Sequence, residues 1–75
     1  MKINERIKDY RLSKGITQKY IAEKAGISNK KLSFIENGNV ELKAKDLISI
    51  SKALEVPVSF FTNEVLENKN SKIIS

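Results

Sequence analysis

The chain has 75 residues, no cysteine, no histidine and a formal net charge of +5. A chain of this length forms one domain with a small core, and the missing residue types exclude disulfides, thiolate nucleophiles and nearly every transition-metal site. No stretch is apolar for long enough to span a bilayer, and the first residues lack the apolar core of a signal peptide. The composition therefore predicts a cytoplasmic protein that binds no metal, cofactor or membrane and is not an enzyme.

Positive charge is concentrated in the first part of the chain. Residues 1–45 carry eleven lysines and arginines against five acidic residues, whereas residues 46–75 carry three against four. Neutralising the phosphates of a polyanion releases counterions, so such a basic region favours nucleic acid as a partner. The alternative is that the lysines only keep the surface of a small protein solvated.

The first predicted helix has Asn4 as its cap and ends before Gly15, which supplies the backbone freedom that helix ends need. Ile7, Tyr10 and Arg11 share one side of this helix because they are three and four residues apart. That side is predicted to face the core.

A helix, a tight turn and another helix are predicted next. Thr17 is a suitable cap for a helix in which Ile21 and Ala22 form part of an apolar side. Gly26 follows where a left-handed backbone ends a helix at no steric cost, and Ser28 is a suitable cap for the next helix. This arrangement is typical of a helix that is presented to a large partner.

The helix after this turn has two different sides. On a wheel of about 100° per residue counted from Asn29, Leu32 and Ile35 fall at about 300° and 240° and are predicted to face the core. Amide, hydroxyl, ammonium and aromatic groups fall between about 0° and 140°, and they belong to Asn29, Lys30, Ser33, Phe34 and Asn37. This mixture is typical of a surface that reads base edges and touches phosphates in a major groove.

A loop from Gly38 to Lys43 is predicted to lead into a fourth helix, Ala44 to Leu54. Neither Leu42 nor Lys43 is a good cap for that helix. Apolar or small residues recur at helical spacing on its inner side, namely Leu47, Ile50, Ser51 and Leu54.

After Pro57 the chain is predicted to form one short helix at residues 58–61 and then a tail. Phe60 and Phe61 are adjacent and cannot point the same way, so one belongs to the core and the other is available to a partner. Residues 62–75 lack the apolar residues for a core of their own. The chain is therefore predicted to consist of a helix-turn-helix domain at residues 1–61 and a tail at residues 62–75. The tail is either frayed or an arm that completes a dimer.

Residues 6–61 resemble the Cro and phage-repressor type of helix-turn-helix domain, known as the XRE family. The resemblance rests on Gln18, Ile21, Ala22, Ala25, Gly26, Ile27, Leu32 and Ile35 at the family's spacing, on Ile35-Glu36-Asn37-Gly38, and on Ala53-Leu54 followed by Val56. It implies an all-α, compact bundle of five helices with a short C-terminal tail. It also implies that Gln18 to Ala25 is the second helix and that Asn29 to Asn37 is the recognition helix. Members of the family are DNA-binding transcription regulators.

The resemblance also implies roles for single residues. Base reading is expected from Asn29, Lys30, Ser33 and Phe34, with asparagine suited to adenine and lysine to guanine. Phosphate contacts are expected from Thr17, Gln18, Lys31, Asn37, Asn39, Lys43 and Lys45. Gln18 is further expected to brace the first residue of the recognition helix. The alternatives are contacts to the DNA backbone only or solvated surface, and for Phe34 packing against the following loop or a second subunit.

Two further expectations concern contacts within and between subunits. Arg11 and Glu36 are expected to form a largely buried ion pair that ties the first helix to the recognition helix, with two exposed charges as the alternative. Dimer contacts are expected from Val58, Phe60, Phe61 and Val65. Together these expectations predict a dimeric repressor or autoregulator on a palindromic site in double-stranded DNA. The alternative is a protein-interaction module, such as an antitoxin or accessory regulator, for which DNA binding is secondary.

Overall fold

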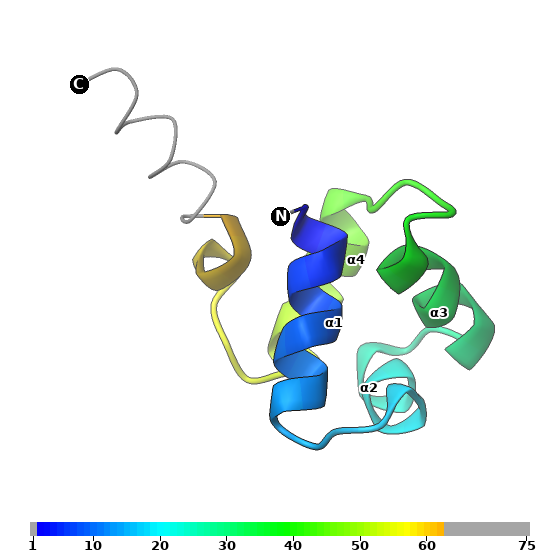
Figure 1. Ribbon diagram of the computed structural model, residues 1–75, viewed down its shortest axis with the longest axis horizontal. Helices are drawn as coiled ribbons and strands as arrows, with labels where there is room; N and C mark the ends of the chain where they lie inside the picture. The colour runs from blue at the N-terminus through cyan, green and yellow to red at the C-terminus, as the bar shows by residue number, and fades with distance from the viewer. Residues whose placement is uncertain (1, 63–75) are drawn as a thin grey trace.

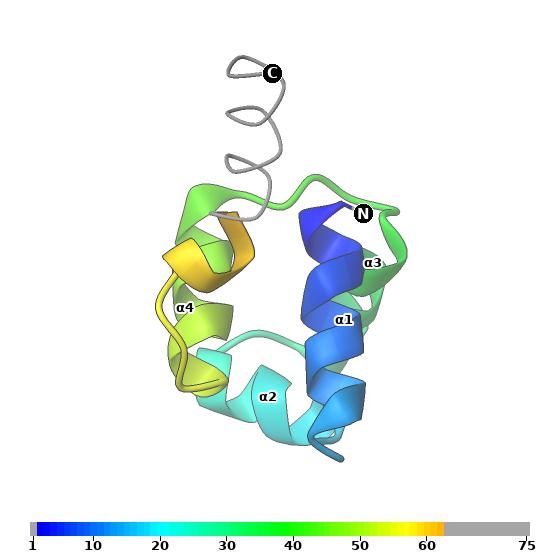
Figure 2. The same cartoon turned by 60° about the vertical axis from the view of Figure 1, so that its left-hand side comes forward.

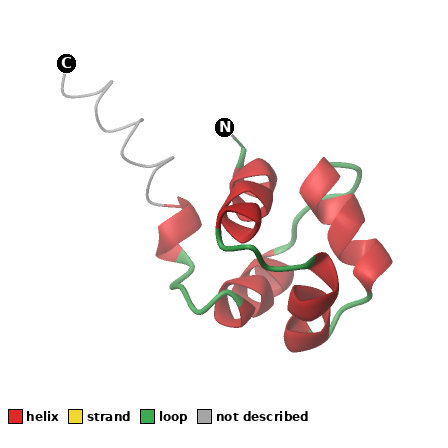
Figure 3. Ribbon diagram, turned by 60° about the horizontal axis from the view of Figure 1, so that its bottom comes forward, coloured by secondary structure: helices red, strands yellow, loops and turns green. Residues whose placement is uncertain are grey.

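The computed structural model describes residues 2–62, and all regular structure in that range is helical (Figures 1 and 3). Its helices are α1 (Ile3–Ser13), α2 (Gln18–Ala25), α3 (Asn29–Asn37) and α4 (Ala44–Ala53), followed by a helical turn at residues 59–62. In Figure 1, α1 lies between α3 and this last turn, with α4 behind it. The predicted all-α fold of five helices is confirmed, and so are the predicted bounds of α2 and α3.

The helices enclose one apolar core. α2 packs against both α3 and α4, and α1 packs against α3. Figure 2 shows α2 lying across the bottom of the bundle, between the lower ends of α1 and α4. The buried apolar residues are Ile7, Ile21, Ala22, Leu32, Ile35, Leu47, Ile50, Leu54 and Phe61. Every helix contributes to this set, so the apolar sides predicted from the sequence meet at its centre.

All four helices end in the same way. A residue with positive φ follows each helix, and the N–H of the next residue donates back to a carbonyl in the last turn, as in a Schellman motif. Gly15, Gly26 and Gly38 occupy three of these positions, with φ of 69°, 74° and 76°. Glu55 occupies the fourth with a φ of 60°, although it carries a Cβ. The end of α4 is therefore the strained one.

The start of α1 differs from the prediction. Lys2, not Asn4, is at the N-cap, and no side chain caps the helix. Asn4 lies inside the first turn, and its Nδ2 donates to the backbone oxygen of Glu36 at 3.3 Å. The predicted cap was wrong because the amide satisfies a carbonyl near the end of α3, where intrahelical partners are missing. As expected from its sequence, α4 begins without a side-chain cap at Lys43.

The last helical turn directs its two aromatic side chains to different places. Phe61 is 0% exposed and belongs to the core, whereas Phe60 is 40% exposed. Tyr10 packs edge-on against both rings, with centroid distances of 4.9 Å to Phe60 and 6.2 Å to Phe61. The predicted divergence is confirmed, but the expected dimer contact at Phe61 is wrong because its own subunit encloses the side chain. Val65 and the two alternatives for the tail lie outside the described residues.

Candidate nucleic-acid interface

The turn between α2 and α3 is held by a short series of hydrogen bonds. The Ile27 N–H donates to the Ala22 oxygen at 3.0 Å across Gly26, which ends α2. Ser28 Oγ then accepts the Lys31 N–H at 3.0 Å and caps α3. These are the capping and chain-reversal roles predicted for Gly26 and Ser28, and they fix the direction in which α3 leaves the turn.

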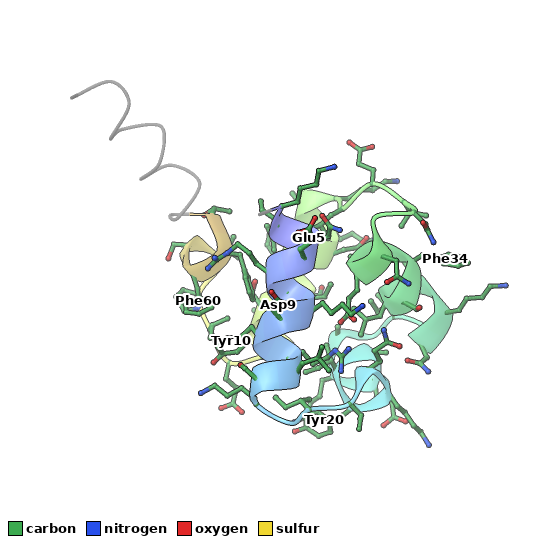
Figure 4. The ribbon with its side chains drawn as sticks, viewed as in Figure 1. Glu5, Asp9, Tyr10, Tyr20, Phe34 and Phe60 are labelled. Atoms are coloured by element: carbon green, nitrogen blue, oxygen red, sulfur yellow. The ribbon has the colours of Figure 1, made fainter. Side chains whose placement is uncertain are left out.

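α3 turns one side to the core and the other to solvent. Leu32 and Ile35 are 0% exposed. The opposite side carries the four residues expected to read bases, with Asn29, Lys30 and Phe34 exposed and Ser33 half-buried. We call these four residues the reading face. Figure 4 shows the Phe34 ring pointing away from the bundle, on the opposite side of the molecule from Phe60.

Within the reading face, an aromatic ring and a cation lie together. Phe34 is 38% exposed, and Lys30 Nζ lies 5.7 Å from the centroid of its ring. This distance is within the range of a cation–π contact, which at an exposed site is worth about 0.5–1 kcal/mol. The contact orients Lys30 along the side of α3 that faces solvent.

A buried ion pair connects α1 to the end of α3. Arg11 Nε donates to Glu36 Oε2 at 2.8 Å, and Arg11 Nη2 donates to Glu36 Oε1 at 2.9 Å. The two side chains are 7% and 0% exposed. Arg11 Nη1 also donates to the Ile16 oxygen at 2.7 Å. The two parallel bonds fix the orientation of the guanidinium as well as its position, because a planar fork matches a carboxylate in only a few geometries.

Gln18 joins this ion pair. Its Nε2 donates to Glu36 Oε1 at 2.9 Å, and its side chain is half-buried. This contact replaces the expected brace on Asn29, which lies at the other end of α3. A charged carboxylate is a stronger acceptor than a neutral group, which explains why the amide turns toward it. The second amide hydrogen and the amide oxygen of Gln18 have no partner within residues 2–62.

Most of the other residues expected to contact phosphate are exposed. Asn37 and Asn39 flank Gly38 at the end of α3, and Lys43 and Lys45 flank the start of α4. Thr17 is exposed as well, and its Oγ1 accepts the Tyr20 N–H at 3.1 Å as the cap of α2. Its hydroxyl hydrogen is still available as a donor while the oxygen caps the helix.

Lys31 has a different environment, which its position in the sequence does not indicate. Its Nζ lies 3.4 Å from Asp46 Oδ2, and the two side chains are 46% and 4% exposed. Asp46 belongs to the first turn of α4. Its burial could have been anticipated, because Asp46, Ile50 and Leu54 follow one another at four-residue intervals and so share the inner side of the helix.

A shallow hollow of about 380 Å³ separates the reading face from the loop before α4. Lys30, Lys31 and Phe34 line one side of it, and Val40, Lys43 and Asp46 line the other. Within residues 2–62, no cluster of three or more acidic side chains is placed to hold a metal ion. No helix in the described part has both the length and the hydropathy needed to cross a membrane.

The capped turn and the exposed side of α3 define a helix-turn-helix domain. The helix-turn-helix family model matches residues 7–61. The chain belongs to this family, in its XRE-type branch, and the match indicates a DNA-binding regulatory domain.

Three solved structures of regulators resemble the chain over most of its length. SinR, a master regulator of biofilm formation solved with DNA, is 36% identical with a TM-score of 0.71, covering 80% of this chain and 97% of that one. The restriction-modification controller protein C.Esp1396I is 32% identical with a TM-score of 0.77, covering 92% and 90%. The P22 c2 repressor, solved with a synthetic operator, is 28% identical with a TM-score of 0.71, covering 81% and 92%. A comparison with curated proteins found no match.

Proposed function

We propose that this protein is a cytoplasmic, dimeric transcriptional repressor or autoregulator that inserts α3 into the major groove of a two-fold symmetric operator. One observation carries the proposal. The residues that can form bidentate or apolar contacts with base edges are collected on the solvent side of a helix whose other side is anchored in the core. A helix held in this way presents its side chains to a groove in a fixed register.

The surroundings of the reading face support the same function. Four exposed residues lie at the end of α3 and the start of α4, namely Asn37, Asn39, Lys43 and Lys45. The two DNA strands that border a groove would pass these positions. The role of these four residues in the proposal is to bind phosphates and so to set the position of α3. Such contacts carry no sequence information of their own.

The dimer contact is proposed to lie at a second surface, on the opposite side from Phe34 in Figure 4. This surface, the Phe60 patch, is a hollow of about 320 Å³ lined by Arg6, Asp9, Tyr10, Ser13 and Phe60. It combines an exposed aromatic ring with one cation and one anion. Opposite charges on the same patch suit a two-fold contact, because the cation of each copy can then face the anion of the other. Val58, half-buried beside the core, is proposed to extend this contact.

Selection from random duplex DNA tests the proposal. The protein is incubated with a library of random duplexes, the bound sequences are enriched, and the best sequence and a scrambled control are then titrated at two salt concentrations. The proposal predicts enrichment of a two-fold symmetric site with half-sites about 34 Å apart, one helical turn of DNA.

Two other outcomes have distinct meanings. Weak and salt-sensitive binding without an enriched sequence would contradict the proposal and leave only charge attraction to DNA. The alternative of a protein-interaction module would then account better for the exposed Phe34 and Val40. An enriched site with a single half-site would support base reading but contradict the dimer.

A further inference from the structure

Asp46 is a buried acid at the edge of a hollow that three lysines also line. The residue is 3% exposed, and within residues 2–62 its one ion-pair partner is Lys31. The hollow beside it is also lined by Lys30 and Lys43, and by a second acid, Glu41, which is exposed. Burial distinguishes Asp46 from Glu41, because a buried carboxylate without a cation has a high desolvation cost.

Lys31 lies next to the reading face, and its ammonium pairs with an acid of another helix. On the wheel of α3 it falls about 60° beyond Phe34, at the border of the exposed side. Residues at this border face the phosphates that line a groove, while residues at the centre face the bases. The Lys31 ammonium is instead directed across the hollow to Asp46 of α4, at 3.4 Å.

We propose that Asp46 holds Lys31 away from the DNA backbone and thereby limits the sequence-independent affinity of the protein for duplex DNA. The inference rests on the DNA-binding function proposed above and assigns a positioning role to Asp46. Moving Lys31 to a phosphate would leave the buried carboxylate of Asp46 unpaired, so the pair stays together when DNA binds. In the absence of that carboxylate, each subunit gains one lysine that can neutralise a phosphate.

The substitution Asp46→Asn tests this role because it keeps the shape of the side chain and removes its charge. Two controls accompany it. In the double variant Asp46→Asn/Lys31→Gln, the released cation is absent. Glu41→Gln makes the same change of charge at the same hollow, but on an exposed acid without an ion-pair partner within residues 2–62.

Affinity is measured by titration of duplex DNA over a range of salt concentrations, with the selected sequence and a scrambled duplex. Each phosphate neutralised adds about 0.9 to the slope of log affinity against log salt. Asp46→Asn is therefore expected to lose about 3.5-fold more affinity per subunit than wild type when salt rises about fourfold, from about 50 to 200 mM. The slopes of Glu41→Gln and of the double variant are expected to stay close to that of wild type. At low salt, the gain in affinity of Asp46→Asn is expected to be equal on both duplexes, because phosphates are the same in each.

Each other result overturns the inference in a recognisable way. An unchanged slope in Asp46→Asn means that Lys31 does not reach a phosphate when released. A steeper slope that persists without Lys31, or that Glu41→Gln reproduces, means that only overall charge matters. A loss confined to the selected sequence means that Asp46 merely supports the reading face. Absence of any duplex binding by wild type overturns the proposed function itself, and this inference with it. Helix content is checked by circular dichroism, and Asp46→Ser replaces Asp46→Asn if the asparagine variant is unfolded.

Discussion

Replacing Glu36 with glutamine probes the buried ion pair with the smallest possible change of shape. The Glu36 carboxylate is 0% exposed and accepts three hydrogen bonds, two from Arg11 and one from the Gln18 amide, at 2.8 to 2.9 Å. A glutamine at position 36 has one acceptor oxygen and one NH₂ group. One Arg11 donor would then face another donor, and the guanidinium charge would lose its counter-ion in a site where its side chain is 7% exposed.

The expected cost follows from the desolvation of the remaining charge. Removing one partner of a buried ion pair costs about 3–5 kcal/mol, because the other charge stays buried without compensation. At about 0.05–0.15 kcal/mol per residue, a domain of this size has a free energy of unfolding of about 4–11 kcal/mol. Glu36→Gln is therefore expected to remove a large fraction of the stability.

Urea unfolding followed by circular dichroism measures this cost. Glu23→Gln is the matched control, since Glu23 is an exposed acid on α2 and undergoes the same chemical change. Its effect is expected to stay within about 0.5 kcal/mol. Arg11→Met/Glu36→Leu removes both charges and is expected to be much less destabilised than the sum of its single variants. A loss below about 1 kcal/mol in Glu36→Gln, or a double variant as unstable as that sum, would refute the argument from an uncompensated charge.

Further predictions concern packing, the dimer contact and backbone strain. Phe61→Ala is expected to cost about 3–5 kcal/mol in urea unfolding because its side chain lies in the core. Phe60→Ser removes a ring that packs on Tyr10 but is 40% exposed, so it is expected to cost less than Phe61→Ala and to sediment as a monomer; a dimeric Phe60→Ser protein would disprove the Phe60 patch as the dimer contact. Gly38→Ala is expected to destabilise the protein more than Gly26→Ala. Both sites have positive φ, but only at Gly38 would the new Cβ meet a side-chain atom, Asn4 Nδ2 at 3.1 Å. Equal losses of stability in the two variants would count against an effect of that close contact. Glu55→Gly is expected to stabilise the protein by about 1 kcal/mol and to raise Tm by about 4–8 °C, because glycine adopts the left-handed conformation without the steric cost of a Cβ. An unchanged or lower Tm in thermal unfolding would mean that this end of α4 is unstrained.

The helices and their ends could be predicted from the sequence because their signals are local. Thr17 and Ser28 cap the helices that follow them, and Gly26 adopts the left-handed conformation expected of it. Each of these signals depends on residues only a few positions apart, and the apolar spacing of α3 and α4 gave their buried sides. Local reasoning failed at Asn4, whose amide is drawn to a carbonyl 32 residues away.

The polar contacts of the candidate site were harder to predict. The direction of Gln18 depends on where Glu36 lies in space, and the pairing of Lys31 depends on where the start of α4 lies relative to α3. Neither distance can be obtained from periodicity. Burial of Asp46 was accessible from its four-residue spacing to Ile50, but its charge favoured an exposed position, and only tertiary packing resolves that conflict.

The most direct test of the central account is a comparison of wild type and Asn29→Ala on the selected duplex and on a scrambled one. Asn29 is exposed at the start of α3, so its truncation leaves the core intact. If it forms a bidentate contact with a base, affinity for the selected duplex falls by about 1–3 kcal/mol, or about 5- to 150-fold, while affinity for the scrambled duplex is unchanged. Equal affinities of the two proteins for both duplexes would contradict base reading by this residue, and an equal loss on both would assign it to the phosphate backbone.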